Sequence, residues 1–112
     1  MKKRLYYSNC RLVRRIKIGN QELSVFNCDN LRIGKERYDG FIEHKNKEIF
    51  LNRKCKDKRL NLMHEIVHNI FWQLSKSKKL HKSIRKSMMR LRKSEKFVEE
   101  LSEYLIKLGE KL

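Results

Sequence analysis

The stretch that most constrains this chain is residues 64–68, which read H-E-x-x-H and lie inside an apolar run over residues 60–74. On a helix, residues i and i+4 share a face, so His64 and His68 can offer two imidazole nitrogens to one metal ion. Glu65 is rotated by only about 100° from His64, so its carboxylate can reach a water molecule on that metal. Two neutral nitrogen ligands suit zinc, and a catalytic zinc keeps an open position for water. The pattern therefore predicts a hydrolytic zinc site with Glu65 as general base.

The competing interpretation is a pair of histidines partly buried on an ordinary core helix. Apolar side chains occur nearly all round this helix, which is typical of a buried central helix; they are Leu60, Leu62, Met63, Ile66, Val67, Ile70, Phe71, Trp72 and Leu74. Two histidines and a glutamate on such a helix need polar partners, because unpaired burial costs a few kcal/mol. A metal ion would satisfy all three groups, so the context favours the metal site.

Length and cysteine content bound the class of protein. The 112 residues suit one domain, 1–112, with a modest core, and no stretch approaches the roughly twenty apolar residues of a membrane span. The basic start is followed by residues 5–11, which are not apolar enough for a signal peptide. Cys10, Cys28 and Cys55 form no Cys-x-x-Cys pair, and an odd count without a secretory signal predicts reduced thiols in a cytoplasmic protein.

The formal net charge of +16 favours contact with an anionic partner, although a lysine-rich surface also keeps small proteins soluble. The basic segment 76–94 contains nine Lys or Arg and no acid. Leu80, Ile84, Met88 and Leu91 recur there at helical spacing. One interpretation is a basic amphipathic helix that lies on nucleic acid, on an anionic surface or on the protein's own core. The other is a solvated loop or helix with a thin apolar stripe.

Residues 1–53 have the pattern of β-strands. Two β-rich runs, 12–18 and 21–26, flank Gly19-Asn20 and predict a hairpin, and residues 27–30 (Asn-Cys-Asp-Asn) predict a turn. A second hairpin is expected from residues 41–44 and 48–52. The expected fold class is α+β: a small N-terminal antiparallel sheet packed on an active-site helix over 54–75 and a C-terminal helix over 95–112.

The C-terminal helix is amphipathic, with Ser94 as its expected N-cap. Its expected apolar face consists of Phe97, Leu101, Tyr104, Leu105, Leu108 and Leu112. Acidic residues cluster on the same helix, at Glu95, Glu99, Glu100, Glu103 and Glu110.

A catalytic zinc needs a third protein ligand. The metzincin pattern is excluded, because Phe71 and Leu74 stand where it requires Gly and His. A carboxylate of the C-terminal helix and His81 in the basic segment both remain candidates. Among the carboxylates, Glu95 and Glu100 border opposite edges of the apolar face, while Glu99 and Glu103 point further outward.

Residues 62–68 (Leu-Met-His-Glu-Ile-Val-His), followed by residues 95–99 (Glu-Lys-Phe-Val-Glu), resemble the small ImmA/IrrE-like zinc metallopeptidases of phages and mobile elements. The resemblance covers roughly residues 38–108 and implies a minimal zincin-like fold. It also implies that His64, His68 and Glu95 are the zinc ligands, that Glu65 is the general base, and that Glu99 supports a ligating histidine. The basic segment departs from this pattern, and so does the downstream motif, which lacks the Ala-Asn and Leu-Met-Pro residues of larger members.

SprT-like proteases are the second family considered, and they would use a third histidine, here His81. The chain has no C-terminal cysteine ribbon of the kind found in that family, and the residues after His81 do not resemble it.

The sequence therefore predicts a cytoplasmic zinc metalloendopeptidase acting on a protein or peptide, such as a regulatory protein, with no membrane partner. Such enzymes often bind an extended substrate along an edge strand, and residues 48–52 are the expected edge. The alternative is a basic nucleic-acid- or protein-binding module whose zinc is structural or idle, with nucleic acid contacting residues 76–93. A third hypothesis is a structural domain without metal.

Overall fold

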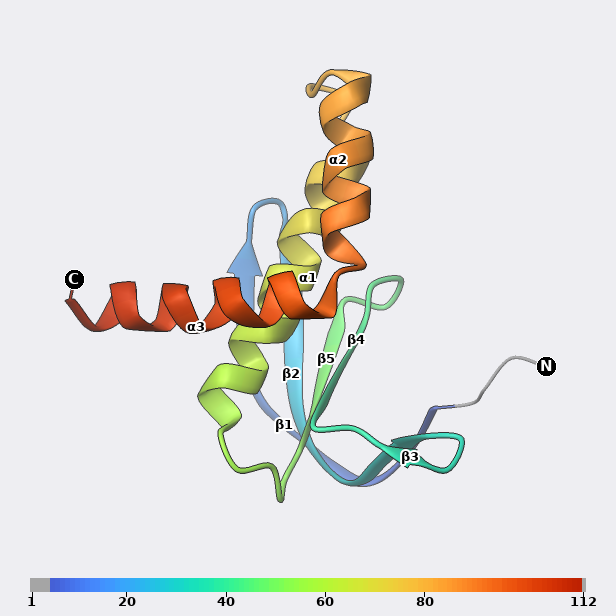
Figure 1. Ribbon diagram of the computed structural model, residues 1–112. Coiled ribbons are helices and arrows are strands. Elements are labelled where there is room, and N and C mark those ends of the chain that lie inside the picture. The colour runs from blue at the N-terminus through green and yellow to red at the C-terminus, as the bar shows by residue number, and fades with distance from the viewer. Residues whose placement is uncertain (1–4, 112) are drawn as a thin grey trace. The chain divides into compact units, whose positions relative to one another are not determined.

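Five strands precede three helices, so the fold class is α+β as expected (Figure 1). The computed structural model describes residues 5–111. The strands are β1 (Leu5–Ile18), β2 (Gln21–Ile33), β3 (Glu36–Arg37), β4 (Gly40–Glu43) and β5 (Glu48–Asn52), and the helices are α1 (Lys58–Lys76), α2 (Lys82–Arg92) and α3 (Glu95–Lys111). The chain forms two compact parts whose boundary falls inside α1, between Leu62 and Met63. The packing of the sheet on the helices and the single zincin-like domain stay predictions.

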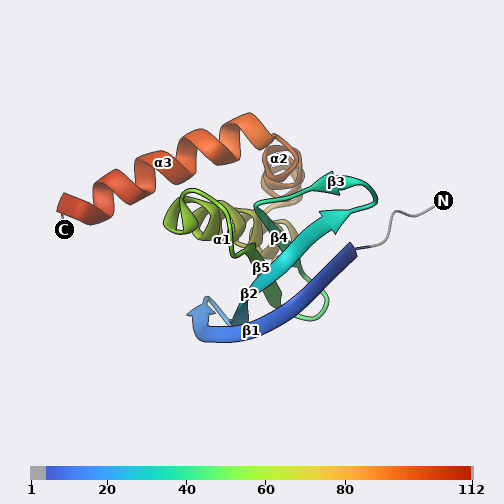
Figure 2. The same cartoon turned by 90° about the horizontal axis from the view of Figure 1, so that it is seen from below.

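The first hairpin is confirmed: β1 and β2 pair in antiparallel register around the Gly19-Asn20 turn, and Gly19 takes a φ of 60° (Figure 2). The turn expected at residues 27–30 is wrong, because these residues lie inside β2. Asn9 and Asn30 adopt left-handed φ angles of 50° and 53°, and the β1–β2 register shifts at several points. Asparagine tolerates such angles, so these two residues form local irregularities within the paired strands instead of ending a strand in a turn.

The second hairpin is confirmed, with β4 antiparallel to β5. However, the sheet order is β1-β2-β5-β4, and β5 runs parallel to β2 from Ser24↔Glu48 to Cys28↔Asn52. The sheet is therefore mixed, not purely antiparallel. The expectation that residues 48–52 form an exposed edge is also wrong, because both sides of β5 are paired.

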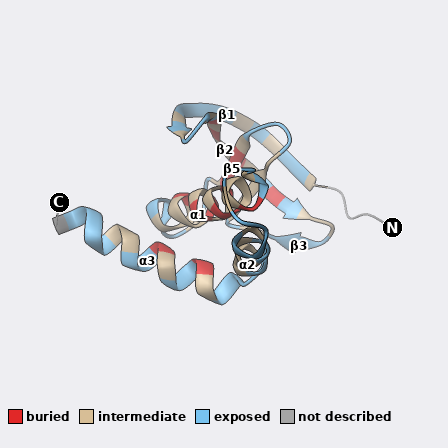
Figure 3. Ribbon diagram, turned by 90° about the horizontal axis from the view of Figure 1, so that it is seen from above, coloured by how far each residue is buried: buried red, intermediate tan, exposed pale blue. Residues whose placement is uncertain are grey.

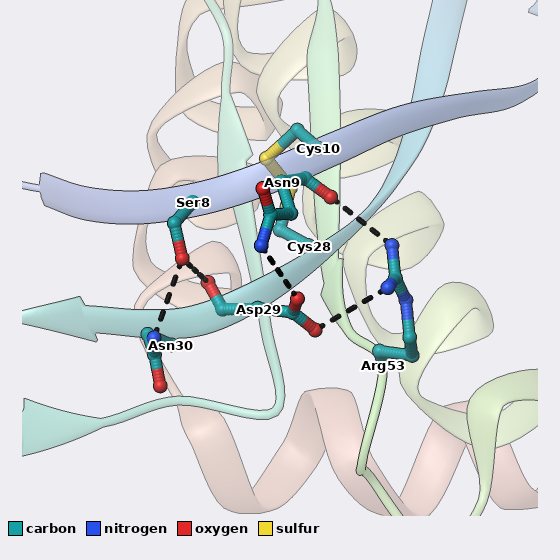
Figure 4. The surroundings of a disulfide bond; sticks show 7 residues. All are labelled: Ser8, Asn9, Cys10, Cys28, Asp29, Asn30 and Arg53. Atoms are coloured by element: carbon teal, nitrogen blue, oxygen red, sulfur yellow. Dashed lines mark hydrogen bonds and ion pairs between the residues drawn. A yellow bond between two sulfur atoms is a disulfide. The ribbon is translucent and has the colours of Figure 1, made fainter.

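Cys10 and Cys28 form a disulfide, so the expectation of three reduced thiols is wrong for this pair (Figure 4). The two residues face each other across β1 and β2 with Cα atoms 4.1 Å apart, a proximity that their 18-residue separation does not reveal. Around them Arg53 pairs with Asp29 at 3.5 Å and donates to the Asn9 carbonyl at 3.0 Å. Because disulfides persist mainly in oxidising compartments, the cysteines no longer support the cytoplasmic location, which stays a prediction.

The sheet part has its own core, in which buried Cys28, Leu31 and Phe50 are packed by partly buried neighbours. Among residues 5–111, the structure contains no helix with the length and apolar character needed to cross a membrane.

Helix α1 begins at Lys58, four residues later than expected. The Asp57 side chain accepts a hydrogen bond from the Leu60 amide at 3.0 Å and so caps the helix. Upstream, Asn52 accepts from the amides of Lys54 and Cys55, which holds the charged residues after β5 in a turn. Local side-chain to backbone bonds therefore set the start of the helix.

The helical part has a second core, formed by Val67 and Phe71 of α1 and Val98 of α3. The basic segment contributes a true helix, α2, whose Met88 and Leu91 pack against this core. The Ser94 cap of α3 is confirmed by the hydrogen bond from the Phe97 amide to its hydroxyl, at 3.4 Å.

The expected apolar face of α3 is partly wrong. Tyr104 and Leu108 are 68% and 45% exposed, while Val98 and Ser102 are completely buried (Figure 3). Ser102 is tolerated there because its hydroxyl donates to the Val98 carbonyl at 2.6 Å. The buried stripe is thus centred on smaller residues than the apolar pattern suggested, and Leu112 lies outside the described residues.

Candidate metal centre

Helix α1 brings His64 and His68 together as their i, i+4 spacing predicts. Their Nε2 atoms lie 3.2 Å apart, and the rings meet edge to face with centroids 4.8 Å apart. Neighbouring Val67 and Phe71 are buried in the core, and this fixes the rotation of α1 and hence the direction of both imidazoles.

Helix α3 supplies the third group, Glu95, at its first residue. One carboxylate oxygen of Glu95 lies 2.8 Å from Nε2 of His64, and the other lies 3.1 Å from Nε2 of His68. Ser94 fixes this position by capping α3, and Val98, one turn further on, anchors the helix in the core. Residues 31 positions apart in the chain therefore converge on one point.

The three side chains could hold a metal ion. All of their ligand atoms lie within 4.8 Å of one another. The two imidazole nitrogens are 3.2 Å apart, and each lies about one hydrogen-bond length from a different oxygen of the Glu95 carboxylate, at 2.8 Å for His64 and 3.1 Å for His68. Two imidazoles and one carboxylate also match a known type of catalytic zinc set, which leaves a fourth position for water.

Burial is graded across the cluster. The Glu95 side chain is 71% exposed, whereas those of His64 and His68 are 21% and 12% exposed. The pKa of His68 lies below its ordinary value, chiefly because burial disfavours the charged imidazolium. The lowered pKa favours the neutral imidazole, which is the form that binds metals.

The backbone of Arg92 makes a hydrogen bond with the His68 ring. Since Nε2 of His68 faces Glu95 and His64, this bond falls to Nδ1. A ring held in this way presents an unprotonated Nε2 to a metal, as ligating histidines commonly do. Sequence reasoning missed Arg92, because the acceptor is a main-chain carbonyl and carries no side-chain signal.

Glu65 is buried, with only 6% of its surface exposed. Burial, reinforced by the negative charge of Glu95, raises the pKa of Glu65 from 4.5 to about 8. A divalent cation at the cluster would oppose the effect of Glu95 and favour the ionised form. Glu65 is therefore a carboxyl group that can take up and release a proton near neutral pH.

The other candidate residues lie outside the cluster. His81 caps the N-terminus of α2, where its Nδ1 accepts from the Ser83 amide at 3.2 Å. Glu99 and Glu100 are exposed on α3. The structure thus groups Glu95, rather than these three residues, with the two histidines. The supporting role of Glu99 stays a prediction.

Comparisons of this chain with protein-family models, with curated proteins and with solved structures found no match. The resemblance to ImmA/IrrE-like peptidases therefore rests on the residues of the two motifs.

Proposed function

We propose that this protein is a zinc-dependent metallopeptidase. The observation that carries the proposal is the convergence of His64, His68 and Glu95, whose ligand atoms lie within 4.8 Å of one another beside buried Glu65. The resemblance to ImmA/IrrE-like enzymes adds the substrate class, a protein or peptide such as a regulatory protein.

In this mechanism His64, His68 and Glu95 hold the ion, and the Arg92 carbonyl keeps the His68 ring oriented. Bound zinc supplies a Lewis acid that polarises a carbonyl group and brings the pKa of water toward 7. Glu65 takes the proton from the attacking water and later gives it to the leaving amine. Burial and Glu95 favour the protonated form of Glu65, and the positive charge of a bound ion would oppose this and favour the carboxylate that the first step needs.

The proposal is tested with Glu65→Gln, which removes the base but none of the three ligands. The variant should bind zinc as wild type does, while cleavage of unfolded proteins by the zinc-loaded enzyme falls by at least the ~100-fold that proton transfer contributes. New peptide termini would be counted by mass spectrometry, and zinc by elemental analysis.

Glu103→Gln is the matched control, because it makes the same chemical change at an exposed position of α3. It should keep both zinc and activity. Equal cleavage by wild type and Glu65→Gln would contradict the mechanism, and wild type that retains no zinc would contradict the site itself.

A further inference from the structure

The proposed metal site gives no role to the basic segment, in which positive charges are concentrated. Residues 76–93 carry nine Lys or Arg and no acid. Seven of these cations are exposed and are called the cationic surface: Lys76, Lys78, Lys79, Lys82, Lys86, Arg90 and Lys93.

Helix α2 aligns part of this surface. Lys82, Lys86 and Arg90 follow one another at i, i+4 and i+8, so they form a row along one side of the helix. Met88 and Leu91 leave the helix on the opposite side and pack against the Val67, Phe71 and Val98 core. That packing fixes the rotation of α2 and turns the row of cations away from the helical core.

The cationic surface is not neutralised within the protein. Within the described part of the chain, none of its seven cations forms an ion pair, and the nearest acid along the chain, Glu95, contacts the two histidines. Like charges on one helix face destabilise it by a few tenths of a kcal/mol per pair. An arrangement that works against the stability of the helix suits an external polyanion that neutralises it.

The composition of the surface favours nucleic acid over a membrane or an acidic protein. A helix that lies in a membrane interface needs a free apolar face, usually with Trp or Phe. Residues 76–93 contain no Trp, Phe or Tyr, and Met88 and Leu91 of α2 are already packed. Ile84 and Met89 are exposed, but they stand five positions apart and therefore on different sides of the helix, so they form no continuous apolar face. A protein interface would need an apolar or aromatic centre, which the row of cations lacks. Closely spaced cations with small Ser83 and Ser87 between them match a phosphate backbone.

We propose that the cationic surface of residues 76–93 binds nucleic acid through its phosphate backbone, with little preference for base sequence. It ends beside the metal centre, because the Arg92 carbonyl holds His68 and Glu95 follows three residues later. Nucleic acid bound to α2 would thus hold the proposed peptidase among proteins that share that nucleic acid.

The test uses the triple variant Lys82→Gln, Lys86→Gln, Arg90→Gln. Glutamine keeps nearly the helix propensity of lysine and arginine, so α2 should stay folded, which circular dichroism would check. The matched control is Arg11→Gln, Arg15→Gln, Lys17→Gln on β1, which removes the same charge at exposed positions. The probe is a labelled DNA duplex of mixed sequence, titrated from about 50 to 200 mM salt.

Wild type and the β1 control should bind with a steep salt dependence. The α2 variant should lose at least tenfold in affinity at low salt, and its slope of log K against log salt should be shallower by about 2.7, the value for three phosphate contacts. No binding by wild type at low salt, or equal losses in both triple variants, would overturn the proposal.

Two competitors identify the kind of anion. Phosphatidylserine vesicles or polyglutamate that displace the duplex at equal charge concentration would overturn the assignment to nucleic acid in favour of a membrane or an acidic protein. Binding by Glu65→Gln equal to that of wild type would support a surface independent of the chemistry, so failure of the proposed peptidase would leave this inference intact.

Discussion

Glu95 is the residue on which the metal centre most depends, because its carboxylate contacts both histidines of α1 from the first residue of α3. We expect Glu95→Ala to weaken zinc binding by more than the ~10- to 100-fold that loss of a supporting partner costs, since a direct ligand is lost. Zinc affinity would be measured by competition with a chromogenic chelator.

Glu100→Ala is the control for this substitution, because it removes an exposed carboxylate from the same helix. Zinc affinity should stay at the wild-type value in the control. If Glu100→Ala or His81→Ala released zinc and Glu95→Ala did not, the assignment of the third ligand would be wrong.

Glu65 makes the stability of the metal-free protein depend on pH. Its folded-state pKa of about 8 exceeds the ordinary value of 4.5, so folding favours the neutral carboxyl group. The stabilising contribution is complete below about pH 4.5 and is lost as pH rises through about 8, by an amount on the order of several kcal/mol.

Glutamine cannot ionise, so metal-free Glu65→Gln should lose less stability than metal-free wild type over this range. Urea unfolding in the presence of a chelator, at about pH 5 and about pH 9, compares the two free energies. Parallel decreases in both proteins would show that Glu65 is not the group responsible.

At the scale of the helices and strands, local signals were predictive and distant pairings were not. The Gly19-Asn20 pair correctly predicted the first hairpin, and the spacing of apolar residues correctly predicted α1 and α3. The parallel pairing of β5 with β2 joins residues about twenty-four positions apart, such as Ser24 and Glu48, and no turn or periodicity marks it. The interior position of β5 and the Cys10–Cys28 contact were missed for the same reason.

The candidate site shows the same division. His64, Glu65 and His68 are fixed by spacing within one helix, whereas Glu95 was selected by resemblance, because periodicity left several carboxylates and His81 open. The Arg92 carbonyl could not have been found from residue types. The Asp57 cap was also missed, because the helix was expected to begin at residue 54, although aspartate is among the preferred residues at a helix start.

The Asp57 cap yields a prediction for α1. Asp57→Ala should lower the free energy of unfolding by about 1 kcal/mol, because the Leu60 amide loses its side-chain acceptor. Chemical denaturation measures the change. Lys56→Ala, one residue earlier and also exposed, should be neutral. Equal effects of the two substitutions would contradict the cap.

For the molecule as a whole, the disulfide provides a test of the sheet part. Closing the stretch between Cys10 and Cys28, which are 18 residues apart, should stabilise the fold by about 3 kcal/mol. A reducing agent should lower the unfolding midpoint of wild type and of Cys55→Ser, since Cys55 is free. It should not affect Cys10→Ser. If the reducing agent left the unfolding midpoint of wild type unchanged, the disulfide would contribute nothing to stability.

The convergence of His64 with Glu95, 31 positions along the chain, means that a bound ion is also a removable cross-link. It would close a long loop that contains all of α2, and such closure restricts local opening of the chain. This loop carries nine of the chain's 29 lysines and arginines, all within residues 76–93, and each is a potential trypsin cleavage site. Trypsin should therefore cut this loop slowly when the ion is bound and rapidly after chelation, which makes digestion a direct reporter of metal occupancy.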